Sequence, residues 1–195
     1  MADLSPERRT AAIEPSASHT AAALKKANRI AKRRETPGRV IGDVKMGDCI
    51  HYVTAGEWSM HDLLFHLLDK TGPADVYAAS WSITEDPVRQ LITRIVDRRI
   101  LHLHAILDWR TKVRCPAVLA LAQANFTDIH LTNCHAKCTA IINKKWQIAI
   151  VGSANYTNNP RIETGVVHCD PTAATFHRDW ILAQIALSDP LDMKG

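Results

Sequence analysis

The sequence lacks any long hydrophobic run. No apolar stretch approaches the ~20 residues that a membrane-spanning helix needs, and the first residues lack the apolar core of a secretory signal peptide. The five cysteines are odd in number and scattered along the chain, so they predict no disulfide framework and suit a reducing compartment. These absences predict a cytoplasmic protein without a membrane partner. The 195 residues contain no internal repeat, and their number suits one domain with or without an appendage.

A strong charge of either sign is missing from most of the chain. The net charge of +4 comes entirely from residues 1–40, which hold nine Lys and Arg against four Asp and Glu. The remaining residues hold 15 basic and 16 acidic side chains. This distribution predicts a basic arm over residues 1–40 and a near-neutral domain over residues 41–195.

The arm divides into two parts by composition. Residues 1–20 are rich in Ala, Ser, Pro and charge without an apolar period, which is typical of disorder. Strong helix formers predict a helix over residues 21–35, which ends at Thr36-Pro37-Gly38. Two interpretations of its cations stay open: a solvated surface, or an arm that displaces counterions from nucleic acid. In the second, the binding residues are Lys25, Lys26, Arg29, Lys32, Arg33 and Arg34.

Strand and helix patterns alternate over residues 41–195. Strands are expected over residues 48–54, 74–83, 100–107 and 162–169, and another begins at Asp128 and carries His135. Helices are expected from Ser59 to Gly72, from Asp86 onward, from Cys115 through Ala124, and over residues 171–187. The alternation predicts an α/β domain with a mixed, largely parallel sheet flanked by helices, in which the last strands are open to antiparallel pairing.

Residues 129–165 carry the most distinctive chemistry. His135 and Lys137 lie two positions apart in a strand-like run, so they are expected to share one face of a strand. The opposite face is expected to be small and core-like, with Cys134, Ala136 and Cys138. A second apolar run ends in Gly-Ser-Ala-Asn at residues 152–155, and Glu163 follows. An imidazole can attack phosphorus to give a phosphohistidine.

The neighbouring residue types suit the same chemistry. Ammonium, hydroxyl and amide groups bind the oxygens on which charge develops during phosphoryl transfer, and the Gly152 turn can offer backbone N–H groups. A carboxylate can hold the imidazole in its attacking tautomer. The candidate catalytic residues are therefore His135, Lys137, Ser153, Asn155 and Glu163. This chemistry requires no metal, and we expect no cofactor.

The order H-x-K, G-S-x-N and glutamate resembles the HKD motif of the phospholipase D superfamily, in its single-motif, nuclease-like branch. The resemblance covers roughly residues 74–165 and implies a phospholipase D-like α/β fold. It departs from the family's H-x-K-x4-D, because Ile142 followed by Asn143 stands where the aspartate is expected. The spacing to Gly152 is also three residues longer than usual. In the family that aspartate mainly braces the site.

The resemblance implies a metal-independent phosphodiesterase or endonuclease. The family site takes two H-x-K motifs and this chain has one, so the resemblance implies a homodimer whose two His135 side chains meet at the two-fold axis. Nucleic acid, DNA in the first instance, is favoured over lipid because the arm is basic and no bilayer anchor is evident. Two alternatives stay open: an inactive domain that binds nucleic acid without cleaving it, and an enzyme for lipid or small phosphodiesters.

A zinc site is the other candidate in this region. The potential ligands are Cys134, His135, Cys138, His168 and Cys169. Zinc usually takes cysteine pairs from tight turns, whereas Cys134 and His135 are adjacent in a predicted strand and would face opposite ways. The pattern therefore does not favour zinc.

Overall fold

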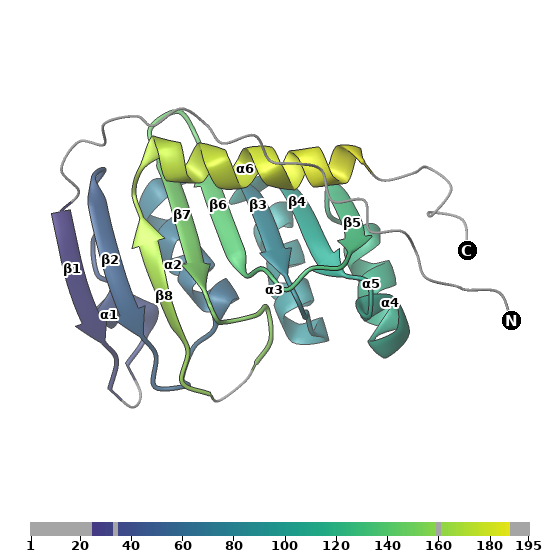
Figure 1. Ribbon diagram of the computed structural model, residues 1–195, viewed down its shortest axis with the longest axis horizontal. Helices are drawn as coiled ribbons and strands as arrows, with labels where there is room; N and C mark the ends of the chain where they lie inside the picture. Colours follow the sequence, from purple (N-terminus) through teal and green to yellow (C-terminus); the bar gives the residue numbers. More distant parts are fainter. Residues whose placement is uncertain (1–24, 33–34, 159–160, 188–195) are drawn as a thin grey trace, which may run out of the picture.

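The computed structural model describes residues 25–32, 35–158 and 161–187. Within these ranges, eight strands form one sheet in the order β1-β2-β8-β7-β6-β3-β4-β5 (Figure 1). The strands are β1 (Lys25–Ile30), β2 (Asp48–Val53), β3 (Ala74–Ser80), β4 (Ile100–Asp108), β5 (Asp128–Thr132), β6 (Cys138–Ile142), β7 (Gln147–Gly152) and β8 (Thr164–His168). The helices are α1 (Pro37–Val40), α2 (Met60–Thr71), α3 (Glu85–Val96), α4 (Thr111–Arg114), α5 (Pro116–Gln123) and α6 (Pro171–Ala186).

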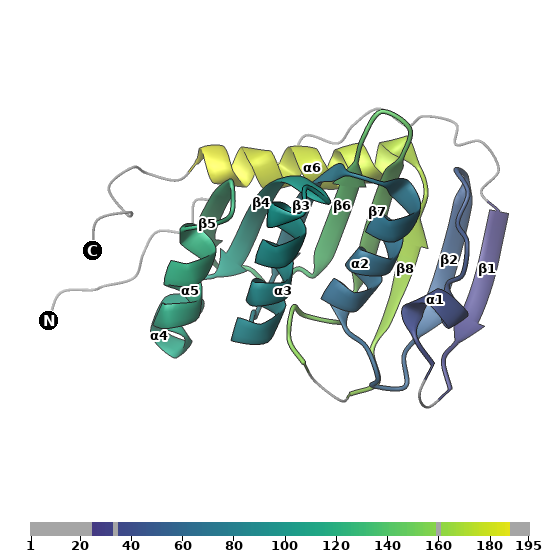
Figure 2. The same cartoon turned by 180° about the vertical axis from the view of Figure 1, so that it is seen from behind.

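Helices cover both faces of the sheet. Helices α2, α3 and α5 lie on one face, and α6 crosses the other (Figures 1 and 2). The mixed α/β architecture expected from the sequence is confirmed. No helix in the described ranges is long and apolar enough to cross a membrane.

The sheet is less parallel than the sequence pattern predicts. Strand β1 is parallel to β2, and β4 is parallel to both β3 and β5. The pairs β2–β8, β8–β7, β7–β6 and β6–β3 are antiparallel. Only a short turn joins β6 to β7, and no helix joins β7 to β8 in the described residues. A parallel pairing needs a longer crossover, so these strands return antiparallel.

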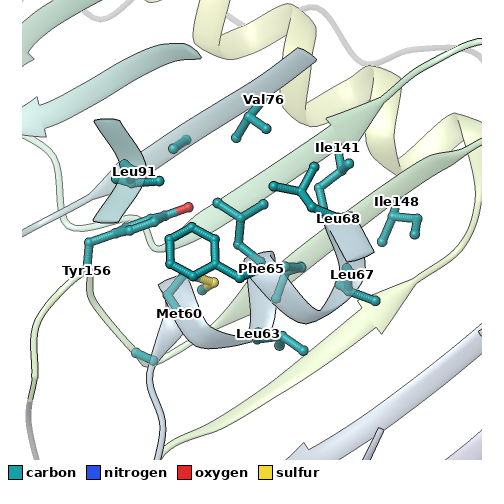
Figure 3. Close-up of a cluster of buried hydrophobic side chains, with 14 of the residues drawn as sticks. Met60, Leu63, Phe65, Leu67, Leu68, Val76, Leu91, Ile141, Ile148 and Tyr156 are labelled. Atoms are coloured by element: carbon teal, nitrogen blue, oxygen red, sulfur yellow. The ribbon is translucent and has the colours of Figure 1, made fainter. Parts of the chain in front are cut away.

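The larger core lies between α2 and the sheet. Ser59 begins α2, where its backbone N–H donates to Asp62 at 2.8 Å, and Gly72 ends the helix at a φ of 77°. One side of α2 buries leucines completely against residues of β3, β6 and β7, as Figure 3 shows for Val76, Ile141 and Ile148. Each such leucine contributes about 1.5–3 kcal/mol through burial. This packing holds the strands whose ends build the candidate site.

The smaller core lies beneath α6. Ile181 is fully buried there, in one cluster with Ile106 of β4 and with small and aromatic residues of β3 and β6. Cys134 and Cys138 belong to this cluster, as the core-like face in the sequence analysis predicts. Ala136, expected on the same face, is exposed.

The helix predicted over residues 21–35 is wrong for residues 25–30, which form β1. Lys25 pairs with Asp48 and Ile30 with Val53, so backbone hydrogen bonds to β2 replace those of a helix. Ala27 packs against the larger core. The apolar stripe of such a helix would be thin, and tertiary pairing overrides helix propensity in this situation. Residues 1–24 and 33–34 lie outside the described residues.

The prediction that His135 lies in a strand is also wrong. Strand β5 ends at Thr132 and β6 begins at Cys138, so residues 133–137 connect them. Strand β5 is at the edge of the sheet beyond β4, whereas β6 pairs with β3. Because neighbouring strands are ~4.8 Å apart, a connection from β5 past β4 and β3 to β6 covers roughly 14 Å along the sheet edge. Residues 133–137 therefore cannot hydrogen-bond to a neighbouring strand as a strand would.

Candidate active site

The predicted catalytic residues gather where β7 ends and β6 and β8 begin, at the lower edge of the sheet in Figure 1. His135 and Lys137 lie in the connection before β6, Ser153 follows β7, and Glu163 precedes β8. Strands β6 and β8 both pair antiparallel with β7, so their first residues flank the last residues of β7. The topology therefore brings together segments that are distant in sequence.

Lys137 binds the segment of residues 133–137, which we call the His135 connection, to the end of β7 through a hydrogen bond. Its backbone oxygen accepts a hydrogen bond from the Gly152 N–H at 3.1 Å. Its Nζ donates to the backbone oxygen of His135 at 2.8 Å. Burial lowers the pKa of Lys137, and the nearby Cys134 and Glu163 only partly oppose this. An ammonium thus lies at the backbone of His135, whose side chain is exposed.

Glu163 pairs with Ser153. The Ser153 hydroxyl donates to the Glu163 carboxylate and accepts from the Thr164 N–H at 3.0 Å. The Glu163 N–H donates to Thr54 Oγ1 at 2.9 Å, and its backbone oxygen accepts from the Thr54 N–H at 2.7 Å. The residue pattern predicts that this carboxylate accepts a hydrogen bond from the His135 ring. The carboxylate instead orients Ser153 and acts electrostatically on Lys137.

Asn155 and His135 both meet the end of β3. The Ser80 hydroxyl, in the last residue of β3, lies 3.2 Å from Asn155 Oδ1 and donates to it. The next residue, Trp81, places its ring centroid 5.8 Å from that of His135 at an interplanar angle of 55°. The end of β3 therefore positions both residues.

Asp108 supports the His135 connection and was missed in the sequence analysis. It is 1% exposed, at the end of β4, and accepts from Arg110 Nε at 2.6 Å. Its carboxylate also accepts from the backbone N–H of Cys134, the residue before His135. Burial raises the pKa of Asp108, but these hydrogen bonds outweigh it and hold the pKa below its usual value. An acid followed by an arginine directly after a buried strand is the signal that could have revealed it.

Gly152 serves packing as well as the site. A Cβ there would lie 2.7 Å from the Thr164 backbone oxygen and 3.3 Å from Tyr52 Oη. At Gly165, which pairs with Gly152, a Cβ would lie 2.5 Å from the same Oη. The Gly152 N–H, expected to face a phosphate, bonds Lys137 instead. Because both positions lack a Cβ, the buried Tyr52 ring can pack directly against them beneath the site.

Ile142, at the position of the motif aspartate, ends β6, and Asn143 follows it away from the site. Asn143 lies in the turn between β6 and β7, at the end of β6 opposite His135. Its Nδ2 donates to the backbone oxygens of Thr71 and Pro73, both at 3.1 Å, and its Oδ1 accepts from the N–H groups of the turn. The length of β6, roughly 16 Å, separates it from His135.

The predicted nucleic-acid-binding residues that the structure describes lie near both ends of β1. Ile30 pairs with Val53, which pairs with Thr164, so the end of β1 lies at the same sheet edge as the catalytic residues. Arg29 and Lys32 are near that end, whereas Lys25 and Lys26 begin the strand at its other end. Arg33 and Arg34 lie outside the described residues. In the described part of the chain, no group of three or more His, Cys, Asp or Glu side chains is arranged to hold a metal ion.

Comparison with known proteins gives matches to solved structures. No protein-family model and no curated protein matches the sequence. NucT from Helicobacter pylori is 15% identical with a TM-score of 0.53, and the match covers 71% of this chain and 97% of NucT. Nuc from Salmonella typhimurium, described as a phospholipase D family member, is 17% identical with a TM-score of 0.56, and the match covers 70% and 94%. The chain therefore has the fold of the phospholipase D family, as the H-x-K and G-S-x-N residues predicted.

Proposed function

We propose that the protein is a metal-independent phosphodiesterase that cleaves nucleic acid through a covalent phosphohistidine at His135. The observation that carries this proposal is the meeting of His135, Lys137 and the Ser153–Glu163 pair at one sheet edge. The phospholipase D fold supports it.

The proposed reaction has two steps. A His135 ring nitrogen attacks phosphorus, and a P–N bond forms while the bond to the leaving oxygen breaks and that oxygen takes up a proton. Water then attacks phosphorus and gives a proton to the group that protonated the leaving oxygen, the P–N bond breaks, and the ring is restored. Splitting the displacement in this way replaces one difficult step with two easier ones.

Three side chains are suited to the phosphoryl oxygens. The Lys137 ammonium supplies positive charge, and the Ser153 hydroxyl supplies a polar contact beside it. Asn155 Oδ1 accepts from Ser80, which orients the amide so that its Nδ2 can donate to phosphate. Glu163 is proposed to position Ser153 and to keep Lys137 charged.

The leaving oxygen needs an acid, and we propose that a second copy of the chain supplies it. The sequence has one H-x-K motif, and the His135 side chain is exposed at the sheet edge. A two-fold axis at this edge would bring two imidazoles together, one to attack and one to protonate the leaving group.

The proposed substrate is nucleic acid, with DNA tested first. Arg29 and Lys32 lie near the catalytic end of β1 and can bind phosphates beyond the scissile one. Lys25, Lys26, Arg33 and Arg34 complete the proposed nucleic-acid-binding set. Each phosphate contact would release counterions and make binding salt-dependent.

The test is cleavage and binding of labelled single- and double-stranded DNA and RNA in EDTA, read from the same samples. Wild-type protein should cleave, and His135→Ala should bind with similar affinity but not cleave. His102→Ala is the matched control, because His102 is exposed on β4 and bonds Asp75 instead of the site residues.

Three other outcomes would contradict the proposal. Binding without cleavage by the wild-type protein would favour an inactive domain that binds nucleic acid. Faster hydrolysis of a choline phospholipid than of any nucleic acid would favour a lipid substrate. Cleavage that His135→Ala retains would exclude His135 as the nucleophile.

A further inference from the structure

Aromatic and cationic side chains adjoin His135 on the side of β4 and β5. The segment from Trp109 to Arg114, which follows β4 and includes α4, reads W-R-T-K-V-R and has three cations and no acid. Trp109 is 49% exposed. Trp81, which follows β3, touches this segment through its ring. We call these residues the tryptophan–arginine patch: Trp81, Trp109, Arg110, Lys112 and Arg114.

Trp81 links the patch directly to the proposed nucleophile. Its ring centroid lies 5.8 Å from that of His135, 5.5 Å from Arg110 Cζ and 5.1 Å from Arg114 Cζ. Contact with an aromatic ring limits the freedom of a guanidinium, so less entropy is lost when it binds an anion. Both cations are thus held one aromatic ring away from His135.

The patch retains positive charge after internal pairing. Arg110 is neutralised by Asp108, which accepts from its Nε and its Nη2. Lys112 and Arg114 are exposed, and neither forms an ion pair with an acid among the described residues. These two cations are available to bind anions from solvent.

The patch is closer to His135 than the basic residues of β1. Strands β2 and β8 stand between β1 and β7, whereas Trp81 contacts the His135 ring itself. A phosphodiester chain held at His135 would therefore meet the patch first on this side. Guanidinium groups match phosphate geometry, and an exposed tryptophan face can stack on any base.

We infer that the tryptophan–arginine patch binds the phosphates and bases that flank the scissile phosphate, so that the enzyme selects polynucleotides over small phosphodiesters. This inference rests on the proposed function and assigns the strand a path across the ends of β3 and β4 toward α4. Arg114 and Lys112 contact the backbone, Trp109 stacks on a base, and Trp81 orients Arg114.

The test compares kcat/KM for a DNA oligonucleotide with kcat/KM for bis(4-nitrophenyl) phosphate, which has no flanking nucleotides. Arg114→Gln and Trp109→Ala should each lower the oligonucleotide value relative to the small-diester value roughly ten-fold, mainly through KM. Arg114→Gln should also reduce the slope of log KM against log salt concentration by roughly one. The control is Arg178→Gln on α6, which removes an arginine paired with Asp179 and should leave the ratio unchanged.

Equal losses on both substrates would overturn the inference, because the patch would then act on chemistry or folding. No loss on the oligonucleotide would overturn it too. If the wild-type protein hydrolyses neither substrate, the proposed function fails, and fluorescence anisotropy with the same oligonucleotide tests the patch separately. Weaker binding by Arg114→Gln and Trp109→Ala, but not by Arg178→Gln, would support the binding surface, and equal binding by all would overturn it.

Discussion

In the proposed reaction, Lys137 must be protonated to stabilise the charge that develops on the phosphoryl group. Burial lowers its pKa despite the opposing effects of Cys134 and Glu163. The ammonium is lost as pH rises through this lowered pKa, so kcat/KM should fall in alkaline solution earlier than a solvated lysine would allow. Arginine stays charged throughout this range. In a pH–rate profile, Lys137→Arg should retain reduced activity, roughly ten-fold below wild type, and its alkaline fall should disappear.

An alkaline fall at the same pH in an active Lys137→Arg enzyme would assign that titration to another group. The small diester is the suitable substrate for this experiment, because its binding does not depend on the distant cations. The profile thus reports on the site and not on nucleic-acid binding.

Glu163 gives a second prediction for a single residue. Glu163→Gln keeps the size of the side chain but removes the negative charge that accepts from Ser153 and supports protonated Lys137. We expect kcat to fall roughly 10- to 100-fold, as for the loss of an orienting partner, while oligonucleotide affinity changes little. Glu57→Gln, at an exposed acid before α2, is the matched control. Single-turnover cleavage measures the effect, and a loss confined to affinity would contradict it.

At the scale of elements, the motif resemblance and the structure lead to opposite expectations for a substitution in the β6–β7 turn. The motif spacing puts the missing aspartate at Ile142, so the resemblance suggests that Asn143→Asp, one residue further on, would partly restore the motif. The structure predicts the reverse, because the Asn143 Nδ2 donates to two backbone oxygens that a carboxylate would repel. We expect Asn143→Asp to lower the free energy of unfolding by about 1–3 kcal/mol without raising activity. Urea unfolding measures this, with exposed Lys144→Ala in the same turn as the control. A more active or more stable variant would contradict it.

Elements with strong local signals were predictable from the sequence. Ser59 and Gly72 mark the ends of α2, and the observed helix spans Met60–Thr71 between them. The apolar run before Gly152 corresponds to β7, which ends at that residue. These signals depend on neighbours a few residues away, so the sequence is sufficient to read them.

Features that depend on distant partners were not predictable in the same way. Strand β1 exists because β2 offers an edge with hydrogen-bonding groups, which residues 25–30 do not reveal by themselves. The irregular path of His135 follows from β5 lying beyond β4 while β6 pairs with β3. Likewise, the pairing of Glu163 with Ser153 follows from the β7–β8 register, which brings Gly152 opposite Gly165. Residue types predicted the cluster, and topology decided the contacts inside it.

On the scale of the whole molecule, histidines are partly or fully enclosed on both faces of the sheet. On the α2 face, His61 is 1% exposed, and burial lowers its pKa although Asp62 and Asp86 oppose this. On the α6 face, burial lowers the pKa values of His168 and His177. His51 lowers the pKa of His168 further, while Asp170 raises it. Folding therefore favours the neutral form of all three rings.

Because these histidines are partly or fully buried in the neutral form, we expect the free energy of unfolding to fall in mild acid. A histidine whose folded pKa lies below its unfolded pKa binds fewer protons in the folded state between those two values. The free energy of unfolding should therefore change little between about pH 7.5 and 8 and decline as pH falls below ~6.5, by up to about 1.4 kcal/mol per pH unit for each extra proton that the unfolded chain binds. Urea unfolding between pH 8 and 5.5 measures this decline.

His177→Gln isolates one contribution to that decline. Glutamine does not titrate, and its side-chain oxygen can still accept from Trp180 Nε1, which donates to His177 Nδ1 at 3.0 Å. The variant should therefore unfold with a shallower pH dependence and gain relative stability at pH 5.5, because one ring no longer takes up a proton on unfolding. An unchanged slope would show that α6 lets His177 take up its proton while folded, and the decline would then belong to His61 and His168.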